Sequence, residues 1–329
     1  MKISLIIFSC LSIFLSTKLS AQNRSSLNEY KIFELPDVNG RLDHMTIDLK
    51  SDRLFVAALG NGTVEVIELK SGKILHSIKD LDKPQGVLYL PGNDLLLVTS
   101  ADDGTCKIFS ASNFKLLKQF QFESDADNIR FDKKREIAFV GFDSGGIAAI
   151  DVLNLKLLYK IVLPAHPESF QIDEDNGKMF VNVPDVNQLI VIDLVKKMIT
   201  ERVKLGIKNN FPMALDLKHQ IIFIGVRNPP KLILIDANSL NIISEKNISG
   251  DADDIYYDQS DSLIFVSCGS GFIDIIKFVN YKDMSLKEEI KTYPGTRTSL
   301  YVPELKKFFV AVRKQDESNA RIIEYSINP

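Results

Sequence analysis

The sequence predicts an all-β protein, a seven-bladed β-propeller with four-stranded antiparallel blades, on three observations. One residue pattern recurs seven times along the chain. The recurrences share one order of four short strands, of which the last recurrence has only the first three, and no segment after the first 21 residues has the period of a helix. A period of this size is typical of solenoids, propellers and arrays, and four short strands per period favour the propeller.

The period is measured between the residues that end the first strand of each repeat. These residues are Asp48, Leu90, Asp132, Asp173, Asp216, Asp258 and Val302, with spacings of 42, 42, 41, 43, 42 and 44. Seven residues after each of them stand Phe55, Leu97, Phe139, Phe180, Phe223, Phe265 and Phe309. Val or Ile follows, and then a small residue, which we expect to prevent crowding where the blades converge on the axis.

The four strands of each repeat follow in a fixed order. The first alternates apolar and polar residues, as in Met45-Thr46-Ile47. The second is the Phe-Val strand and the third is a further apolar run, such as Val64–Leu69; both are apolar on two faces because neighbouring blades cover them. The fourth, such as Lys73–Ile78, is amphipathic and is expected to be outermost. Gly, Asn, Asp and Ser at the junctions supply the turns.

The two ends of the chain predict how the ring closes. Residues 1–21 have the basic start, short apolar run and small-residue end of a secretory signal peptide, and the run is too short for a transmembrane helix. Residues 22–29 are polar and expected to be disordered, and residues 30–329 form one propeller domain. Because the last repeat has only three strands, we expect Tyr30–Leu35 to be the outer strand of the seventh blade.

Export, composition and charge narrow the possible partners. The leader predicts a secreted or periplasmic protein, and Cys10 lies too early in it, after a bulky residue, to favour a lipoprotein. Cleavage removes two lysines and no acid, so the formal charge changes from −3 to −5, which disfavours nucleic acid as a partner. Cys106 and Cys268 lie in inner strands of separate repeats and are expected to be free and buried. We expect a monomer.

The repeat resembles that of the YVTN-repeat β-propellers, mostly secreted or periplasmic bacterial proteins. Phe180-Val181-Asn182-Val183 is close to the motif that names the family, and three third strands end in Ile-Asp, at Ile150-Asp151, Ile192-Asp193 and Ile235-Asp236. The resemblance spans residues 30–329 and implies the fold and the exported location. It implies no single function, because the family has several. The absence of Trp argues against WD-type repeats and quinone-cofactor propellers.

The first residues of the innermost strands are expected to surround the mouth of the central channel. Five residues before the strand ends stand Asp43, Gln85, Asp127, Glu168, Phe211, Asp253 and Arg297, and four residues before stand His44, Gly86, Asn128, Ser169, Pro212, Asp254 and Thr298. Beyond these two positions the strands are expected to be apolar, so that polarity is confined to the mouth. This ring is the predicted ligand-binding site.

The acids of this ring favour a cation. Asp43, Asp127, Glu168 and Asp253 share one position, with Asp254 beside them. Clustered carboxylates bind a cation or raise one another's pKa, and a hard divalent cation such as Ca²⁺ is the candidate cofactor, with Asp43, Asp127 and Asp253 as candidate ligands. No EF-hand loop, HExxH motif or zinc spacing supports it. A solvated polar rim and a site for a polar or cationic small ligand are the alternatives.

Two histidines belong to the same mouth. His44 follows Asp43, and His166 precedes Glu168 by two residues. A histidine beside a carboxylate can act as a general acid or base, which makes His44, His166 and Glu168 the candidate catalytic residues. Because the two histidines come from distant blades, we expect them to lie on either side of a ligand rather than to transfer a proton jointly. The alternative is that both are ordinary polar rim residues.

Three arginines are expected at the mouth as well, Arg297 in the ring and Arg227 and Arg313 at turns entering it. Guanidinium groups suit carboxylate or phosphate, so a zwitterionic ligand would match a mouth with acidic and basic halves. Ion pairing with the rim acids is the alternative.

No nucleophile motif is found in the sequence, and the leading prediction is therefore a ligand-binding or protein-interaction module that acts through its channel mouth. An enzyme is the second hypothesis, either a hydrolase similar to propeller lactonases or a lyase, using a rim histidine, carboxylates and a divalent ion. A scaffold is the third, docking a protein partner through an insert at Phe278–Ser285 and a long polar turn at Arg313–Ala320.

Overall fold

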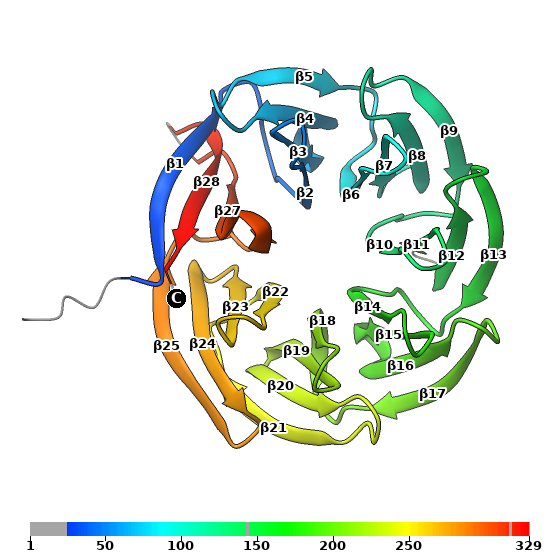
Figure 1. Ribbon diagram of the computed structural model, residues 1–329, viewed down its shortest axis with the longest axis vertical. Helices are drawn as coiled ribbons and strands as arrows, with labels where there is room; N and C mark the ends of the chain where they lie inside the picture. The colour runs from blue at the N-terminus through cyan, green and yellow to red at the C-terminus, as the bar shows by residue number, and fades with distance from the viewer. Residues whose placement is uncertain (1–24, 143–144, 316–317, 329) are drawn as a thin grey trace, which may run out of the picture.

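The computed structural model describes residues 25–142, 145–315 and 318–328. Seven four-stranded antiparallel sheets form a closed ring around a central axis (Figure 1), which confirms the predicted all-β seven-bladed propeller. The helices of the described residues are three single 3₁₀ turns, η1 (Leu59–Asn61), η2 (Pro184–Val186) and η3 (Pro303–Leu305). No helix among the described residues has the length and apolar character needed to cross a membrane. The predicted signal peptide, residues 1–21, lies outside the described residues.

Each blade contributes one strand to each of four positions, and blades 1 to 7 are numbered along the chain. The innermost strands are β2 (Met45–Asp48), β6 (Pro84–Leu90), β10 (Ile129–Asp132), β14 (Phe170–Asp173), β18 (Lys208–Asp216), β22 (Ala252–Asp258) and β26 (Ser299–Val302). The second strands are β3 (Arg53–Ala58), β7 (Leu95–Ser100), β11 (Ile137–Phe142), β15 (Lys178–Val183), β19 (Ile221–Asn228), β23 (Leu263–Cys268) and β27 (Lys307–Val312). The third strands are β4 (Thr63–Glu68), β8 (Thr105–Ser110), β12 (Gly146–Asp151), β16 (Gln188–Asp193), β20 (Pro230–Asp236), β24 (Phe272–Asn280) and β28 (Ala320–Ile327). The outer strands are β5 (Ile74–Ile78), β9 (Leu116–Gln121), β13 (Lys156–Val162), β17 (Met198–Lys204), β21 (Ile242–Asn247), β25 (Asp283–Lys291) and β1 (Leu27–Leu35).

The aspartates of the repeat fold the turns between strands. Every innermost strand ends at the residue from which the repeat was measured, and five of these seven residues are Asp. Asp48 Oδ1 accepts hydrogen bonds from the backbone N–H groups of Lys50 and Ser51, at 3.1 and 3.2 Å. Asp151, which ends a third strand, accepts from the N–H groups of Leu153 and Asn154 at 2.9 and 3.0 Å. The Ile-Asp signature is therefore a turn-forming device.

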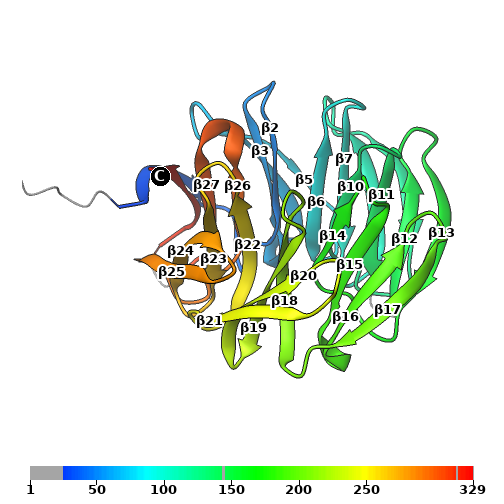
Figure 2. The same ribbon diagram turned by 60° about the horizontal axis from the view of Figure 1, so that its bottom comes forward.

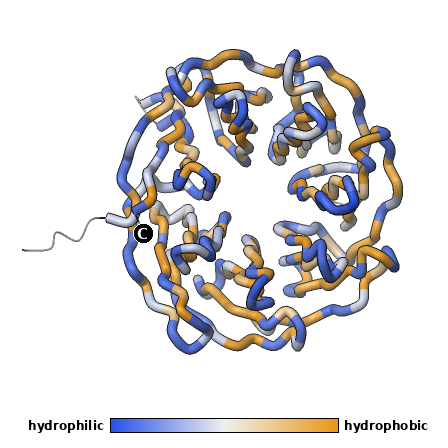
Figure 3. The backbone as a smooth tube through the Cα atoms, in the orientation of Figure 1, coloured by the Kyte–Doolittle hydropathy of each residue, from blue (hydrophilic) through white to orange (hydrophobic). Residues whose placement is uncertain are grey.

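The core lies between blades, in seven hydrophobic clusters that each join two neighbours. Figure 2 shows the sheets stacked in this way around the ring. Fully burying each Phe of the repeat contributes about 1.5–3 kcal/mol. The small residue after Phe-Val leaves room for its own blade and for the next one, since a Cβ on Gly225 would lie 2.6 Å from Pro212 Cγ of the same blade and 3.2 Å from Ala252 Cβ of blade 6. The outer strands alternate hydrophobic and hydrophilic residues, as Figure 3 shows, because one face is exposed to solvent.

The N-terminal strand closes the ring, as predicted. β1 pairs with β28, with Leu27 opposite Ile327 and Leu35 opposite Ala320. The strand starts at Leu27 rather than Tyr30. Residues 27–29, which were expected to be disordered, therefore belong to β1. Ser26 N–H donates to Glu288 Oε2 at 2.6 Å and fixes this segment against β25; residues 22–24 lie outside the described residues.

The insert expected at Phe278–Ser285 is not a loop. It extends the hairpin of β24 and β25, whose last pair is Asn280 and Asp283. Phe278 is buried and packs edge-on against Phe223 of blade 5, with ring centroids 5.2 Å apart, which explains the extension. In the expected long turn at 313–320, Gln315 pairs with Ser318.

Candidate functional site

The rim residues extend the innermost strands by one further backbone pair. Asp43 N–H donates to Ala57 O at 2.7 Å, and Asp127 N–H donates to Gly141 O at 3.0 Å. The small residues of the repeat add bonds to the next blade, because Thr99 Oγ1 donates to the carbonyl of Asp127. Backbone pairs within the blade and a side-chain hydroxyl from the neighbouring blade therefore hold the rim at Asp127.

A cavity of about 550 Å³ occupies the centre of the ring. This volume is within the range of small-molecule sites. The predicted ligand-binding residues that line it are Asp43, His44, Asp127, Asn128, Glu168, Asp253 and Asp254. Four others, Gln85, Arg227, Arg297 and Arg313, are not among its lining residues in the described part of the chain. Gln85 instead donates to Asp125 Oδ1 at 2.9 Å.

The expectation that polarity is confined to the mouth is wrong. Two residues before the strand ends, the cavity is lined by Thr46, Arg130, Gln171 and Tyr256. Sequence reasoning concentrated on the apolar residues on either side of this position and missed these four. Their shared register, with polar residues in four of seven repeats, was the available signal. Arg41, which precedes the strand of blade 1, was missed as well.

Burial and mutual repulsion raise the pKa values of four carboxyl groups in the cavity. Burial raises the pKa of Asp43 to about 7, against the lowering effect of Arg41, whose Nη2 lies 2.8 Å from Asp43 Oδ2. Burial, with the nearby charge of Asp253, raises the pKa of Glu168 to about 7. Burial also raises the pKa values of Asp127 and Asp254 well above the ordinary value. A positive charge that enters the cavity would therefore stabilise the ionised form of these carboxyl groups.

The arginines of the mouth are ion-paired, which is the alternative left open by the sequence. Arg297 Nε lies 2.9 Å from Asp253 Oδ2, and its Nη1 lies 3.0 Å from Asp251 Oδ2. Arg227 pairs with Asp253 and, at 3.2 Å, with Asp251, and its guanidinium stacks 3.6 Å from the centroid of the Phe211 ring. These pairs neutralise Asp253. Arg227 and Arg297 therefore do not give the mouth the basic half that a zwitterionic ligand would need. The third predicted arginine, Arg313, is exposed.

Arg130 is the second arginine of the cavity lining, with Arg41. Its Nη1 donates to Asn128 Oδ1 at 3.3 Å and to the Ile129 carbonyl at 2.9 Å. Among the described residues, no carboxylate lies within 4.0 Å of it. Burial lowers its pKa, and the negative charge of Asp254 acts in the opposite direction.

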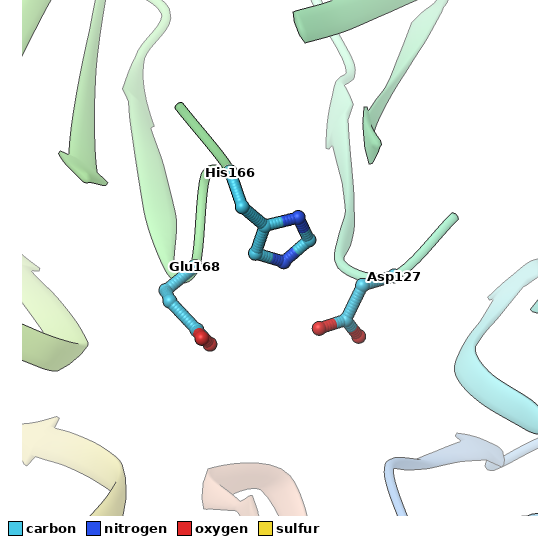
Figure 4. Close-up of side chains that lie close together, drawn as sticks. All are labelled: Asp127, His166 and Glu168. Atoms are coloured by element: carbon cyan, nitrogen blue, oxygen red, sulfur yellow. The ribbon is translucent and has the colours of Figure 1, made fainter. Parts of the chain in front are cut away.

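The two rim histidines have different surroundings. His44 Nε2 lies 4.0 Å from Asp43 Oδ1, and burial together with Arg130 and Arg41 lowers the pKa of His44 to about 3, so its imidazole is neutral. His166 groups with Asp127 and Glu168, each offering one ligand atom within 4.8 Å of the others. Figure 4 shows the imidazole between the two carboxylates, one ring nitrogen directed toward the space that they share.

The structure brings together only part of the predicted metal set. Of Asp43, Asp127 and Asp253, only Asp127 belongs to a group of described side chains with ligand spacing. Asp43 and Asp253 are each paired with arginine. The residues best placed to hold a cation are therefore Asp127, His166 and Glu168. Two of the three candidate catalytic residues, His166 and Glu168, belong to this group, and His44 lies outside it. Cys106 and Cys268 are free and buried, as expected.

These features describe a polar, predominantly acidic cavity with a mixed nitrogen and oxygen donor group at one side of its mouth. No model of a known protein family matches the chain. No curated protein matches it either.

Proposed function

We propose that this protein is a ligand-binding module that takes a small, positively charged polar ligand into its central cavity. The observation that supports this proposal is the charge of the lining. Four acids, Asp43, Asp127, Glu168 and Asp254, face the cavity with two arginines, Arg41 and Arg130, and a fifth acid, Asp253, is paired with Arg227 and Arg297. A concave site with excess charge of one sign concentrates ligands of the other sign.

Arg130 and the deeper polar residues suit a ligand that also carries an acceptor. Arg130 lines the cavity, and its hydrogen bonds to described residues are both made by Nη1; Gln171 and Thr46 are further polar groups of the lining. Tyr256 Oη already donates to the Ser299 carbonyl at 2.7 Å. A ligand with an ammonium group and a hydrogen-bond acceptor therefore matches both levels of the cavity, with the ammonium group at the acids.

Calorimetric titration with 1,4-diaminobutane tests this proposal. We expect binding that weakens as salt concentration rises, since exposed charges are screened. The double variant Asp43→Asn/Asp254→Asn should weaken it at least about tenfold, which corresponds to about 1.4 kcal/mol. Asp175→Asn is the matched control, because that side chain is 92% exposed and lies outside the cavity. Equal affinity in the parent chain and the double variant would contradict the proposal, as would preferential binding of citrate.

A metal-assisted hydrolase or lyase is the second candidate function. The grouping of His166 with Asp127 and Glu168 favours it, because a histidine and two carboxylates can hold a metal ion or exchange protons with a substrate. Hydrolysis of simple lactones, measured with and without EDTA, tests this candidate. Loss of turnover in His166→Gln with retained folding is the expected result, and turnover that is unaffected by this substitution would exclude the candidate.

We also propose that the chain belongs to the YVTN-repeat propellers and acts outside the cytoplasm as a monomer. The repeated Phe-Val pattern and the leader-like residues 1–21 support this assignment. N-terminal sequencing of the exported protein tests the cleavage, which is expected after Ala21.

A further inference from the structure

Three side chains from two adjacent blades converge at one side of the mouth. Asp127 immediately precedes the innermost strand of blade 3, and His166 and Glu168 lie in the connection between β13 and β14 of blades 3 and 4. Their ligand atoms lie within 4.8 Å of one another, and all three residues are partly exposed. The group is therefore reachable by an ion in solution.

Among the described residues, no protein group occupies these ligand atoms. In the described parts of the chain, neither the Asp127 carboxylate nor the Glu168 carboxylate accepts a hydrogen bond or lies within 4.0 Å of a basic group. The ring nitrogen of His166 that faces the two carboxylates in Figure 4 is Nε2, and no described residue forms a hydrogen bond with it, while Nδ1, on the other side of the ring, is buried without a partner. The two carboxylates and the imidazole nitrogen that faces them are therefore all available to an ion placed between them. Asp253 of the same rim differs, because two arginines pair with it.

The backbone holds the group in place. Glu168 N–H donates to Asn182 O at 3.0 Å, and Asp127 is held on both sides by Gly141 and Thr99. A Cβ on Gly141 would lie 3.1 Å from Pro167 Cγ, so the proline between the two ligands packs closely on this glycine. Ligands on a rigid frame lose little conformational freedom when an ion binds.

We infer that Asp127, His166 and Glu168 form a binding site for a divalent transition-metal ion of the Zn²⁺ type, with a coordination position open to the cavity. Imidazole nitrogen with two carboxylates suits Zn²⁺, whereas Ca²⁺ takes six to eight oxygen ligands. Two carboxylates balance the charge of the ion. Three protein ligands leave a fourth position for water or a ligand, as in catalytic zinc sites. This inference rests on the proposed function, the binding of a positively charged ligand in the acidic cavity. It adds that a divalent metal ion binds at the side of the cavity formed by Asp127, His166 and Glu168.

Titration of the EDTA-treated full chain with ZnCl₂ tests the site. Calorimetry should give one equivalent of Zn²⁺, and the midpoint of thermal unfolding should rise, because a ligand that binds the native state stabilises it. Titration with CoCl₂, followed by visible absorption, should give the bands of Co²⁺ bound to nitrogen and oxygen ligands. Neither readout depends on catalytic activity.

The variants assign the binding to these residues. His166→Gln and Asp127→Asn should each weaken Zn²⁺ binding at least about tenfold and remove the Co²⁺ bands, as expected for loss of a metal ligand. His76→Gln is the matched control, because His76 is exposed on the outer strand β5 and stacks on Phe114. Unfolding midpoints measured in EDTA identify a variant that fails to fold. If one of the two ligand variants does not fold, the metal affinity of the other one tests the site. Unchanged binding in a folded His166→Gln or Asp127→Asn chain would overturn the inference.

The diamine titration separates this inference from the proposed function. Zn²⁺ binding that requires His166, without diamine binding, supports the metal site and contradicts an organic cation as the ligand. Diamine binding without Zn²⁺ binding supports the proposed function and overturns the metal site. If neither binds, both are wrong.

Discussion

Arg297 Nε lies 2.9 Å from Asp253 Oδ2, and this pair joins blade 7 to blade 6 at the mouth of the channel. The two side chains are 26% and 20% exposed, so water screens their attraction only in part. Arg227 of blade 5 contacts the same carboxylate, and three blades are therefore linked through one acid.

Arg297→Gln should destabilise the protein by about 1–2 kcal/mol, because Asp251 and Asp253 lose one of their two arginines. Lys83→Gln is the matched control. Its ion pair with Asp102 spans 2.9 Å between half-exposed side chains, and pairs of this kind contribute about 0–1 kcal/mol. Urea unfolding of both variants measures the difference. Equal losses would show that the Arg297 pair contributes no more than a surface pair.

Asp43→Asn should change how stability depends on pH. Burial raises the pKa of Asp43 from 3.8 to about 7, with Asp253 adding to the effect and Arg41 and Arg297 opposing it. The folded state then binds more protons than the unfolded state between about pH 4 and pH 7, so this group lowers the free energy of unfolding as pH rises through that window. Asparagine removes the effect.

The free energy of unfolding of Asp43→Asn, relative to the parent chain, should therefore increase by about 2–4 kcal/mol between pH 4 and pH 8. Urea unfolding at both pH values gives this difference. Asp175→Asn should show no such change, since Asp175 is fully exposed at 92%. A relative stability that falls with pH would mean that Asp43 is held ionised.

His44 should remain neutral from pH 5 to pH 8. Burial, Arg130 and Arg41 lower the pKa of His44 from 6.5 to about 3. The unfolded state binds its proton first, so the contribution of this residue to stability is complete above about pH 6.5 and is lost as pH falls toward 3. In NMR spectra recorded across pH 5–8, the imidazole resonances of His44 should not shift, and His44→Gln identifies them. A titration midpoint near 6.5 would place the imidazole in water.

Gly225→Ala should destabilise the interface of blades 5 and 6. The added Cβ would meet Pro212 Cγ at 2.6 Å and Ala252 Cβ at 3.2 Å. Overpacking of this kind costs about 1–3 kcal/mol. Gly92→Ala is the control, because no atom lies within 4 Å of its added Cβ, and its effect should be within about 0.5 kcal/mol. A thermal midpoint unchanged in Gly225→Ala would contradict the packing reason for the small residue of the repeat.

Phe33→Ala should weaken ring closure. Phe33 of β1 is fully buried and its ring centroid lies 6.4 Å from that of Phe309. Removing a buried Phe side chain costs about 3–5 kcal/mol. Its neighbour Ile32 is 41% exposed on the other face of the strand, and Ile32→Ala should cost less than about 1 kcal/mol. Similar costs for the two variants, measured by urea unfolding, would mean that β1 does not secure the seventh blade.

Several features of the fold could be read directly from local patterns. The spacing of Asp48 and its equivalents located the end of every innermost strand, and the missing fourth strand of the last repeat identified β1 as its replacement. Strand alternation and turn chemistry act between near neighbours in sequence, so each repeat carries them in full. That the insert at Phe278–Ser285 lengthens a hairpin could not be read from local patterns, since Phe278 is buried against a residue of another blade.

The candidate site was only partly predictable. The acids and His166 were identified by register, because position in a repeat determines position around the channel. Which of them stand together was decided by the ring itself. It turns Arg227 and Arg297 onto Asp253 and brings Asp127, His166 and Glu168 together, with no ion pair to their side chains from the described residues. The sequence by itself determined the blades, their strands and the acidic character of the mouth. The pairing of charges was decided only in the tertiary structure, because it depends on angles and distances between blades that no single repeat contains.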